Sequence, residues 1–291
     1  LTSAAYKTLL KKFANMCLEE GVIPTFPVTA NVLDRHPRIF RECQAQGIEF
    51  AVHGYKHVDY SLYSNDLFAE QLRQAEEVFD RYGIDKQGFR FPFLRKERQQ
   101  LNKLAEAGYT WDSSAVISWK SMKREMFSKD AWHDYNSILR TYEGTDAGYC
   151  ASLPRVVHNM VEIPVSVPDD DMLIERLGIN NSSRLAGIWM NMIEHTHERG
   201  EMLVLQLHPE RFNVFEKPLG MLLEKVKNSG DIWTASLNDI AGWWQQRYMT
   251  AWKAEQNGDG TYTVKAEGLK NPPVCFTGQE HSHRPVRLKS G

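Results

Sequence analysis

Two histidines spaced four residues apart give the first sign of chemistry in this chain. His53 and His57 form an HxxxH pair, but with ten histidines in 291 residues about 0.3 such pairs are expected by chance, so the spacing alone is weak evidence. His53 directly follows the apolar run 48–52, and parallel α/β folds carry their active sites at the carboxyl ends of strands. Neutral imidazole nitrogens bind zinc and similar ions. The pair is therefore a candidate metal site, the alternative being two loop histidines with local hydrogen bonds.

Three more polar side chains occupy equivalent places. His208 follows the apolar run Leu203-Val-Leu-Gln-Leu207, Arg90 lies in Gly-Phe-Arg-Phe-Pro, and Asp112 lies in Tyr-Thr-Trp-Asp-Ser-Ser. Histidine can hold or release a proton near neutral pH, and the fork of donors on arginine suits a carboxylate. These residues could complete a catalytic centre, although Asp112 could equally start a turn and Arg90 could be a surface arginine.

The elements that would position these residues alternate in type. Short β-branched and aromatic runs predict strands at 22–28, 48–53, 88–91, 109–112, 161–167, 202–207 and 232–235. Amphipathic periodicity predicts helices at 4–20, 65–82, 97–107, 182–199, 216–228 and 237–248, with a helix-like stretch reaching residue 46. Repeated βα units imply a parallel sheet, open or closed.

Two stretches depart from the alternation. Residues 113–159 have no clear period and many polar and aromatic side chains, so we expect a long insertion of the kind that shapes a binding cleft. Residues 252–266 carry a turn at Asn257-Gly-Asp-Gly260, which predicts a β-hairpin. The sequence thus predicts a main α/β domain over residues 1–250 and a small β appendage with an irregular tail over residues 251–291.

Composition excludes several classes of protein. The 35 basic and 37 acidic side chains leave a formal charge of −2, which offers no broad positive surface for nucleic acid. The longest apolar runs fall far short of the roughly 20 residues that cross a bilayer, so no membrane span is expected. The four cysteines lack CxxC spacing, which argues against a disulfide framework or a thiolate zinc site. The compartment stays open between cytoplasm and cell envelope.

The candidate residues fall in motifs that together resemble the polysaccharide deacetylase family. The motifs Thr25-Phe-Pro-Val28, His53-Gly-Tyr-Lys-His57, Arg90-Phe-Pro-Phe93, Asp112 and Leu207-His208-Pro209 follow that family's order, over roughly residues 20–245. The resemblance implies a distorted (β/α)7 barrel, here without its first strand. It also implies a metal-dependent hydrolase that removes N-acetyl groups from a carbohydrate, such as a bacterial cell-envelope glycan or its precursor.

The resemblance also implies a role for each residue. A divalent ion, most often zinc, would be held by His53, His57 and an aspartate. His208 would protonate the departing amine, with Asp112 helping to hold its proton, and Arg90 would orient the catalytic base.

A second group of residues is expected to bind the substrate. Asp169 and Asp170 follow the predicted strand 161–167, so their carboxylates could bind sugar hydroxyls or amines at the mouth of the barrel, although a solvated helix N-terminus explains them about as well. Phe93, which closes the Arg90 motif, is expected to contact the substrate too.

The start of the chain departs from the family pattern. The family's first motif, TFDDG, supplies the metal-binding aspartate and the base, and it should fall near position 1, where Leu1-Thr-Ser-Ala-Ala5 has no acidic residue. Either the chain is a fragment without its first strand, or the scaffold has lost its base and binds glycans without catalysis. We favour the fragment, because an unpaired strand edge is rarely tolerated. A third hypothesis is hydrolysis of another C–N bond, such as a cyclic amide, on the same scaffold.

Overall fold

The computed structural model describes residues 3–119, 124–258 and 262–266 of the chain. The chain divides into two units, residues 1–241 and 242–291. The division lies inside helix α9 (Leu237–Met249), whereas the sequence predicts a domain boundary after residue 250. That boundary stays a prediction. All the candidate site residues lie in the first unit.

A six-stranded sheet forms the centre of the first unit. In spatial order its strands are β1 (Thr25–Val28), β2 (Glu49–Val52), β3 (Gly88–Phe89), β4 (Trp111–Asp112), β8 (Met160–Glu162) and β7 (Arg155–Val157). Only the β7–β8 pair is antiparallel. The inner strands are buried almost throughout, as expected for a parallel sheet covered on both faces. The α/β fold class is therefore confirmed.

A second, parallel sheet continues from the first. Its order is β6 (Thr145–Asp146), β5 (Val116–Ser118) and β9 (Val165–Val167). The amides of Ile163 and Val165 donate to the carbonyls of Asp112 (2.8 Å) and Ala115 (2.7 Å), which joins the two sheets. Across the described residues the strand ladders do not close into a ring, so the distorted barrel stays a prediction.

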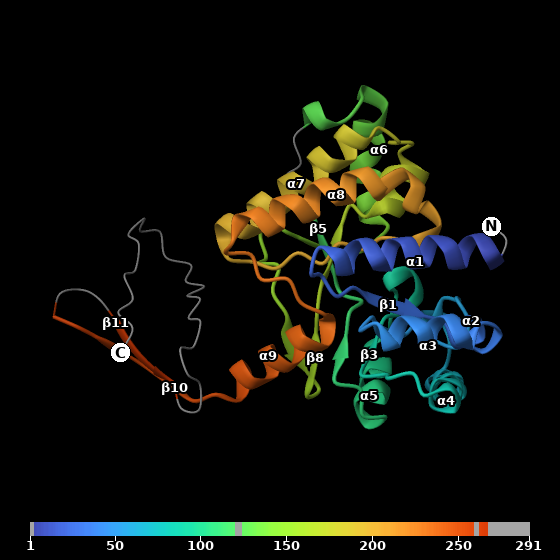
Figure 1. Ribbon diagram of the computed structural model, residues 1–291. Helices are drawn as coiled ribbons and strands as arrows, with labels where there is room; N and C mark the ends of the chain where they lie inside the picture. Colours follow the sequence, from blue (N-terminus) through green and yellow to red (C-terminus); the bar gives the residue numbers. More distant parts are fainter. Residues whose placement is uncertain (1–2, 120–123, 259–261, 267–291) are drawn as a thin grey trace. The chain divides into compact units, whose positions relative to one another are not determined.

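Helices and short helical turns alternate with the strands along the first unit. They are α1 (Ser3–Glu19), α2 (Ala30–Arg35), α3 (Pro37–Ala45), α4 (Asn65–Tyr82), α5 (Arg98–Glu106), α6 (Lys129–Arg140), α7 (Ser182–Arg199) and α8 (Phe212–Ser229). Short helical turns are η1 (Tyr60–Leu62), η2 (Pro92–Leu94), η3 (Arg124–Met126), η4 (Asp171–Arg176) and η5 (Pro209–Arg211). Figure 1 shows α1, α7 and α8 side by side, and α2 to α5 grouped near β1 and β3.

The helices whose bounds were predicted best have clear caps. Helix α4 begins after Ser64, whose hydroxyl accepts from the Leu67 amide at 3.3 Å, and ends at Gly83 with φ +65°. Helix α7 begins after Asn181 and ends at Gly200 with φ +62°. Polar N-caps and left-handed glycine C-caps are local signals, so they can be read from the sequence.

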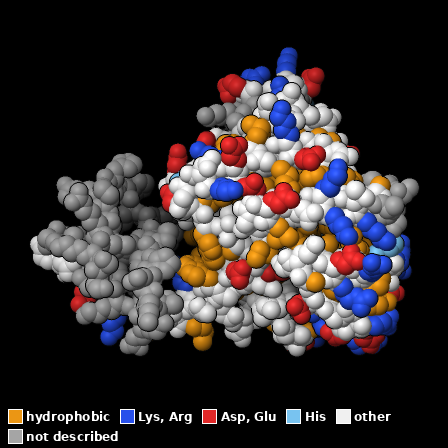
Figure 2. All heavy atoms as spheres, in the orientation of Figure 1, with side chains coloured by type: hydrophobic (Ala, Val, Ile, Leu, Met, Phe, Trp, Pro, Cys, Tyr) orange, Lys and Arg blue, Asp and Glu red, His pale blue; other side chains and the backbone are white. Residues whose placement is uncertain are grey.

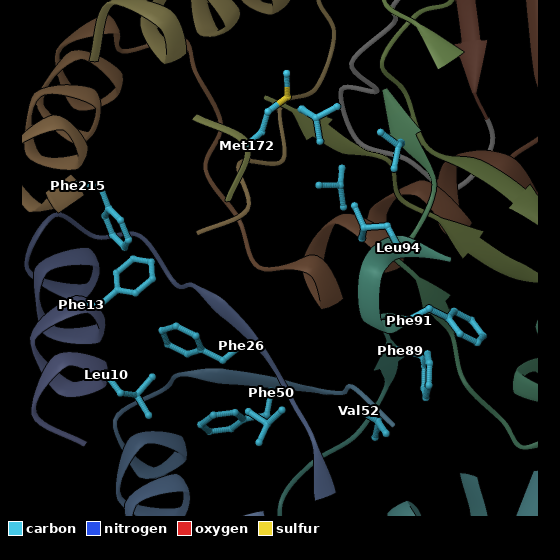
Figure 3. Packing of buried hydrophobic residues seen from close by; sticks show 14 of the residues in the cluster. Leu10, Phe13, Phe26, Phe50, Val52, Phe89, Phe91, Leu94, Met172 and Phe215 are labelled. Atoms are coloured by element: carbon cyan, nitrogen blue, oxygen red, sulfur yellow. The ribbon is translucent and has the colours of Figure 1, made fainter. Parts of the chain in front are cut away.

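Aromatic side chains pack helices α1 and α8 against the first strand of the sheet. Phe13 of α1 contacts Phe26 of β1 and Phe215 of α8, each with ring centroids 5.4 Å apart. Figure 3 shows these three rings facing one another, with Phe50 beyond Phe26. Buried aromatic rings contribute large apolar areas, so this cluster holds β1 and β2 in place and with them the start of the loop that carries His53.

Three sequence predictions need correction. Residues 202–207 do not form a full strand: Leu205 makes one parallel bridge, to Ser166. Residues 232–235 are not a strand. The stretch 113–159 is more regular than expected, since it contains β5, η3, α6, β6 and β7. Short β-branched and aromatic runs predict the strands at 202–207 and 232–235, but such runs do not reveal whether a pairing partner is present.

The second unit contains the predicted hairpin. Strands β10 (Trp252–Gln256) and β11 (Tyr262–Ala266) pair antiparallel, which confirms the hairpin, while the expected irregular tail, 267–291, lies outside the described residues.

The surface agrees with the near-neutral composition. Figure 2 shows basic and acidic side chains interspersed on the face in view. In the ranges that the structure describes, no helix combines the length and apolarity needed to span a membrane.

Candidate active site

His53 continues from strand β2 and has a fixed ring. Its amide donates to the carbonyl of Val28 at 3.0 Å. Its Nδ1 lies 2.6 Å from the carbonyl oxygen of Arg90. Because a carbonyl only accepts, Nδ1 carries the hydrogen and Nε2 keeps a lone pair. Burial lowers the pKa of His53 to about 3. The charge of His57 lowers this pKa further, while the hydrogen bond to Arg90 acts to raise it. A neutral imidazole with a free nitrogen is what a metal ligand requires.

His57 lies beside His53 on the following loop. The ring centroids are 5.1 Å apart and the planes meet at 64°. If two imidazoles bind one tetrahedral ion at about 2.0–2.1 Å, their ring centres lie about 5 Å apart, so the observed separation fits a shared ion. His57 is an exposed residue, and its partial burial together with the charge of His208 lowers its pKa.

The pair offers two protein ligands. Over residues 3–119, 124–258 and 262–266, no three His, Cys, Asp or Glu side chains gather closely enough to hold a metal ion. His53 and His57 therefore suit a metal ion by their ligand type and by the distance between their rings. We assign no third ligand.

His208 is clamped by Asp170. The backbone amide of His208 donates to Oδ2 of Asp170 at 2.8 Å, and Nδ1 of the ring lies 2.6 Å from Oδ1. Burial acts to lower the pKa of His208, but the hydrogen bond and the charge of Asp170 outweigh it and raise that pKa above its ordinary value. The charge of His208 also lowers the pKa of His53 and that of His57, so the three imidazoles share one electrostatic neighbourhood.

Asp170 is itself fully buried and is balanced by Arg211. The side chain of Asp170 has 0% exposure, and the Nη1 atom of Arg211 lies 3.6 Å from its Oδ2. Arg211 also pairs with Asp171 at 3.0 Å and Glu175 at 2.9 Å. A buried carboxylate costs free energy unless it is paired with a cation and hydrogen-bonded. For Asp170, Arg211 supplies the cation and His208 supplies the hydrogen bonds.

Arg90 bonds to neutral groups. Its Nε donates to the carbonyl of Ser113 at 2.8 Å, Nη2 donates to the hydroxyl of Ser113 at 2.7 Å, and Nη1 donates to Oε1 of Gln206 at 3.3 Å. Burial lowers the pKa of Arg90 to about 10, against the opposing charges of Asp112 and Asp169. These three hydrogen bonds hold the guanidinium of Arg90 in a fixed position just after the carboxyl end of β3.

Asp169 is linked to Arg90 through the side chain of Gln206. It accepts from Nε2 of Gln206 at 3.0 Å, from the amide of Met172 at 2.9 Å and from the hydroxyl of Tyr142 at 3.3 Å. The residue has 1% exposure, and burial raises its pKa. Because its oxygens are already engaged, direct contact with a sugar would require rearrangement.

Asp112 lies in a separate ion-pair network. Its carboxylate accepts from Lys96 at 3.0 Å and from the hydroxyl of Ser114 at 2.7 Å, while Lys96 also pairs with Glu162 at 3.0 Å. Burial raises the pKa of Asp112, against the charge of Lys96. The contact with His208 expected for Asp112 belongs to Asp170 instead, because Asp112 is engaged with Lys96.

Phe93 is exposed next to His57. It has 54% exposure and a left-handed backbone with φ +59°, which is rare for a bulky residue and costs free energy. Its ring meets the His57 ring at a centroid distance of 4.6 Å and an angle of 78°. An exposed aromatic held this way is available to a ligand.

Several residues that support the site are not predicted from the sequence. Gln206 is polar within the apolar run 203–207, and a polar residue in such a run needs a partner, so its bridge between Arg90 and Asp169 had a local signal. The link from Tyr142 to Asp169 had none, because it joins distant parts of the chain.

Comparisons with known proteins give a family match over the first part of the chain and a shared fold over most of it. Residues 4–111, which include His53, His57 and Arg90, match the family model described as polysaccharide deacetylase. A search of curated proteins finds no match.

Several solved structures share the fold. A protein from Mycobacterium smegmatis assigned as a polysaccharide deacetylase has a TM-score of 0.65 and 17% identity, over 84% of this chain and 80% of that one. One from Pseudomonas aeruginosa PAO1 with the same assignment has a TM-score of 0.64 and 19% identity, over 84% and 73%. Puue allantoinase has a TM-score of 0.65 and 18% identity, over 83% and 74%. At these identities the likeness establishes the fold. The family model covers residues 4–111 of the 291 residues, so for the chain as a whole these comparisons establish a fold shared with assigned polysaccharide deacetylases and with an allantoinase.

Proposed function

We propose that this protein is a metal-dependent hydrolase that removes N-acetyl groups from a carbohydrate. The observation that supports it best is the electrostatic coupling of His208 to both His53 and His57. A pair of neutral ring nitrogens and a proton-holding imidazole are the two parts that amide hydrolysis needs beside each other.

The His53–His57 pair is the proposed metal site, with zinc as the candidate ion. The bond from His53 Nδ1 to the Arg90 carbonyl orients one ligand, as outer hydrogen bonds do at metal sites. When bound, the ion would supply Lewis-acid polarisation of the acetamide carbonyl. The third ligand and the carboxylate base that the family resemblance calls for are assigned to no residue.

His208 is the proposed general acid. Its raised pKa keeps the ring protonated closer to neutral pH, and with Nδ1 on Asp170 the proton available to a leaving amine is the one on Nε2. Asp170 is the positioning residue for this ring, because both of its oxygens contact His208.

The other predicted residues divide by burial. Phe93 is exposed, so we keep it as a substrate contact, in which an aromatic face packs on a sugar ring. Arg90, Asp112 and Asp169 are buried and bonded within the protein, so we assign them to holding the strand ends in place.

We also propose that the strands form the wall of an incomplete barrel. Segments 111–118 and 160–167 run side by side through both sheets, and Leu205 bridges to the outer side of β9. This continuous order supports the distorted (β/α)7 architecture that the family resemblance implies.

Metal content and acetate release test the proposal. The full-length protein is expected to bind zinc at one ion per chain and to release acetate from N-acetylglucosamine oligomers. His53→Gln and His57→Gln are each expected to lose both properties. A matched control is His197→Gln, since His197 lies on α7 and pairs with Asp231. Absence of bound metal with both histidines intact would count against the proposal.

Two other functions are separated by the same assay. A cyclic amide belongs in the substrate panel because the fold is shared with an allantoinase. Ring opening without acetate release would favour that reaction. Saturable glycan binding without either product would favour a binding protein.

A further inference from the structure

We propose that the buried hydroxyl of Tyr60 positions His57 beside His53. This inference rests on the proposed metal site and names the residue that shapes it. The segment 53–57 leaves β2 and carries both histidines, yet His57 is exposed. An exposed ring on a loop needs something rigid beneath it if it is to bind an ion with its neighbour.

The hydroxyl of Tyr60 is bonded to capacity by this loop. It accepts from the amide of Tyr55 at 2.9 Å and from the amide of Lys56 at 3.2 Å, and it donates to the carbonyl of Lys56 at 3.0 Å. A phenol has one donor and two acceptor sites, so all three are used. All three bonds end on the two residues just before His57.

The ring of Tyr60 is fixed as firmly as its hydroxyl. It has 0% exposure and packs against Phe68 and Tyr63 at centroid distances of 5.7 and 5.3 Å. Its own carbonyl accepts from Nε2 of Gln100 at 2.6 Å. A Cβ built on Gly54 would lie 2.4 Å from the Tyr60 ring, so glycine at position 54 lets the ring lie directly under the loop.

The first turn of α2 holds the other side of the loop. The amides of Ala30 and Asn31 donate to the carbonyls of Gly54 (2.9 Å) and Tyr55 (3.0 Å). His53 is fixed separately, by Val28 and Arg90. Tyr60 is therefore the side chain whose removal would loosen His57 while leaving His53 held.

Tyr60→Phe is the variant that isolates the hydroxyl, because it keeps the ring and its packing. We expect zinc affinity to fall about 10-fold, the lower end of the loss seen when a hydrogen-bond partner of a metal ligand is removed, because the Tyr60 hydroxyl bonds the backbone beside His57 and not the ligand itself. We also expect the visible absorption of the cobalt-substituted protein to shift, since that absorption reports ligand geometry. Isothermal titration with zinc and cobalt spectroscopy measure the two effects.

Tyr63→Phe is the matched control. It removes the hydroxyl of the ring that packs on Tyr60 and is expected to leave zinc affinity and the cobalt spectrum as in the wild type. The near-ultraviolet circular dichroism of both variants monitors folding.

A measurement on the wild type keeps the inference testable if Tyr60→Phe does not fold. Hydrogen exchange at the amides of Tyr55 and Lys56 is expected to slow when zinc is added, because the ion and the hydroxyl then hold the same loop. Unchanged exchange at both amides on zinc binding would overturn the inference.

The outcomes also separate this inference from the proposed function. Wild-type affinity and spectrum in a folded Tyr60→Phe would overturn the inference alone, with the metal site intact. A wild-type protein that binds no zinc or cobalt would overturn both.

Discussion

The contact between His208 and Asp170 decides the chemistry available to this site. Asp170 holds the histidine by its backbone and by its ring, and its charge raises the pKa of His208 against the effect of burial. Since Asp170 is buried with 0% exposure, water does not screen this charge. The pair is therefore suited to keep a proton until a leaving group needs it.

Asp170→Asn tests that role. If His208 is the proposed general acid, it must be protonated to act, so activity is expected to fall as pH rises through the pKa of His208. Without the Asp170 charge this pKa drops, and the alkaline limb of the kcat/KM profile is expected to move to lower pH. The maximal rate should fall about 100-fold, in the range of a lost general acid. The pH–rate profile of acetate release measures both effects.

Asp171→Asn is the control for charge alone. Asp171 is the next residue in the chain, but it pairs with Arg176 and Arg211, whereas Asp170 bonds to His208. Removing the charge of Asp171 should therefore leave the alkaline limb in place. An unmoved limb in Asp170→Asn would show that Asp170 does not set the pKa of His208.

At the scale of elements, the turn η2 is held by the network of Lys96, Asp112 and Glu162. The carboxylates of Asp112 and Glu162 are 1% and 11% exposed, and the hydroxyl of Ser114 links Asp112 to the amide of Phe91. Lys96→Met leaves the buried carboxylate of Asp112 without its cation, while Glu162 keeps its ion pair with Arg155 at 3.3 Å. We expect the free energy of unfolding to fall by about 3–5 kcal/mol, as measured by denaturant titration.

Lys103→Met gives the matched comparison on helix α5. Lys103 pairs with Glu106 at the surface, with side chains 37% and 63% exposed, and exposed pairs contribute little. The stability of this variant should stay close to that of the wild type. Equal losses in the two lysine variants would mean that burial does not distinguish the two ion pairs.

The packing of β3 on β4 depends on a glycine. A Cβ on Gly88 would lie 1.9 Å from the Trp111 ring, and the ring is itself held by a 2.6 Å bond from Nε1 to Asn238. Gly88→Ala is therefore expected to lower the unfolding free energy by about 1–3 kcal/mol. Thermal and denaturant unfolding measure the loss.

Gly187→Ala is the contrasting change. Gly187 lies inside α7, and an added Cβ would meet nothing within 4 Å. Alanine forms helix better than glycine, so this variant should gain about 0.5–1 kcal/mol. A loss of stability in this variant would contradict the open space that the structure shows beside Gly187.

The sequence predicted elements well where their signals are local. Helices α4 and α7 have their caps in the adjacent residues Ser64 and Asn181. Residues 202–207 show the limit, because a strand exists only where a partner pairs with it, and here one bridge at Leu205 is present. Asp170 shows the same limit at the site: its partner His208 lies 38 positions away, and only the fold brings them together.

At the scale of the whole molecule, the candidate site belongs to the first of two units. The predicted appendage begins after residue 250, and the side chains that hold the site lie before that point. Ending the chain after residue 250 is expected to leave zinc affinity and acetate release unchanged, as measured by titration and an acetate assay.

Ending the chain after Ser236 should behave differently. It removes Asn238, which holds Trp111 and whose amide donates to Glu49 at 3.1 Å. This shorter chain should lose stability, because Glu49 is then left without that donor. If truncation after residue 250 abolished zinc binding, the site would depend on the second unit.

The central claim is that His53 and His57 hold one ion with His208 in its neighbourhood. Anomalous diffraction at the zinc edge from crystals grown with zinc tests it most directly. We expect an anomalous peak about 2.0–2.1 Å from one ring nitrogen of His53 and one of His57. A zinc ion bound elsewhere, with both imidazoles unligated, would contradict it.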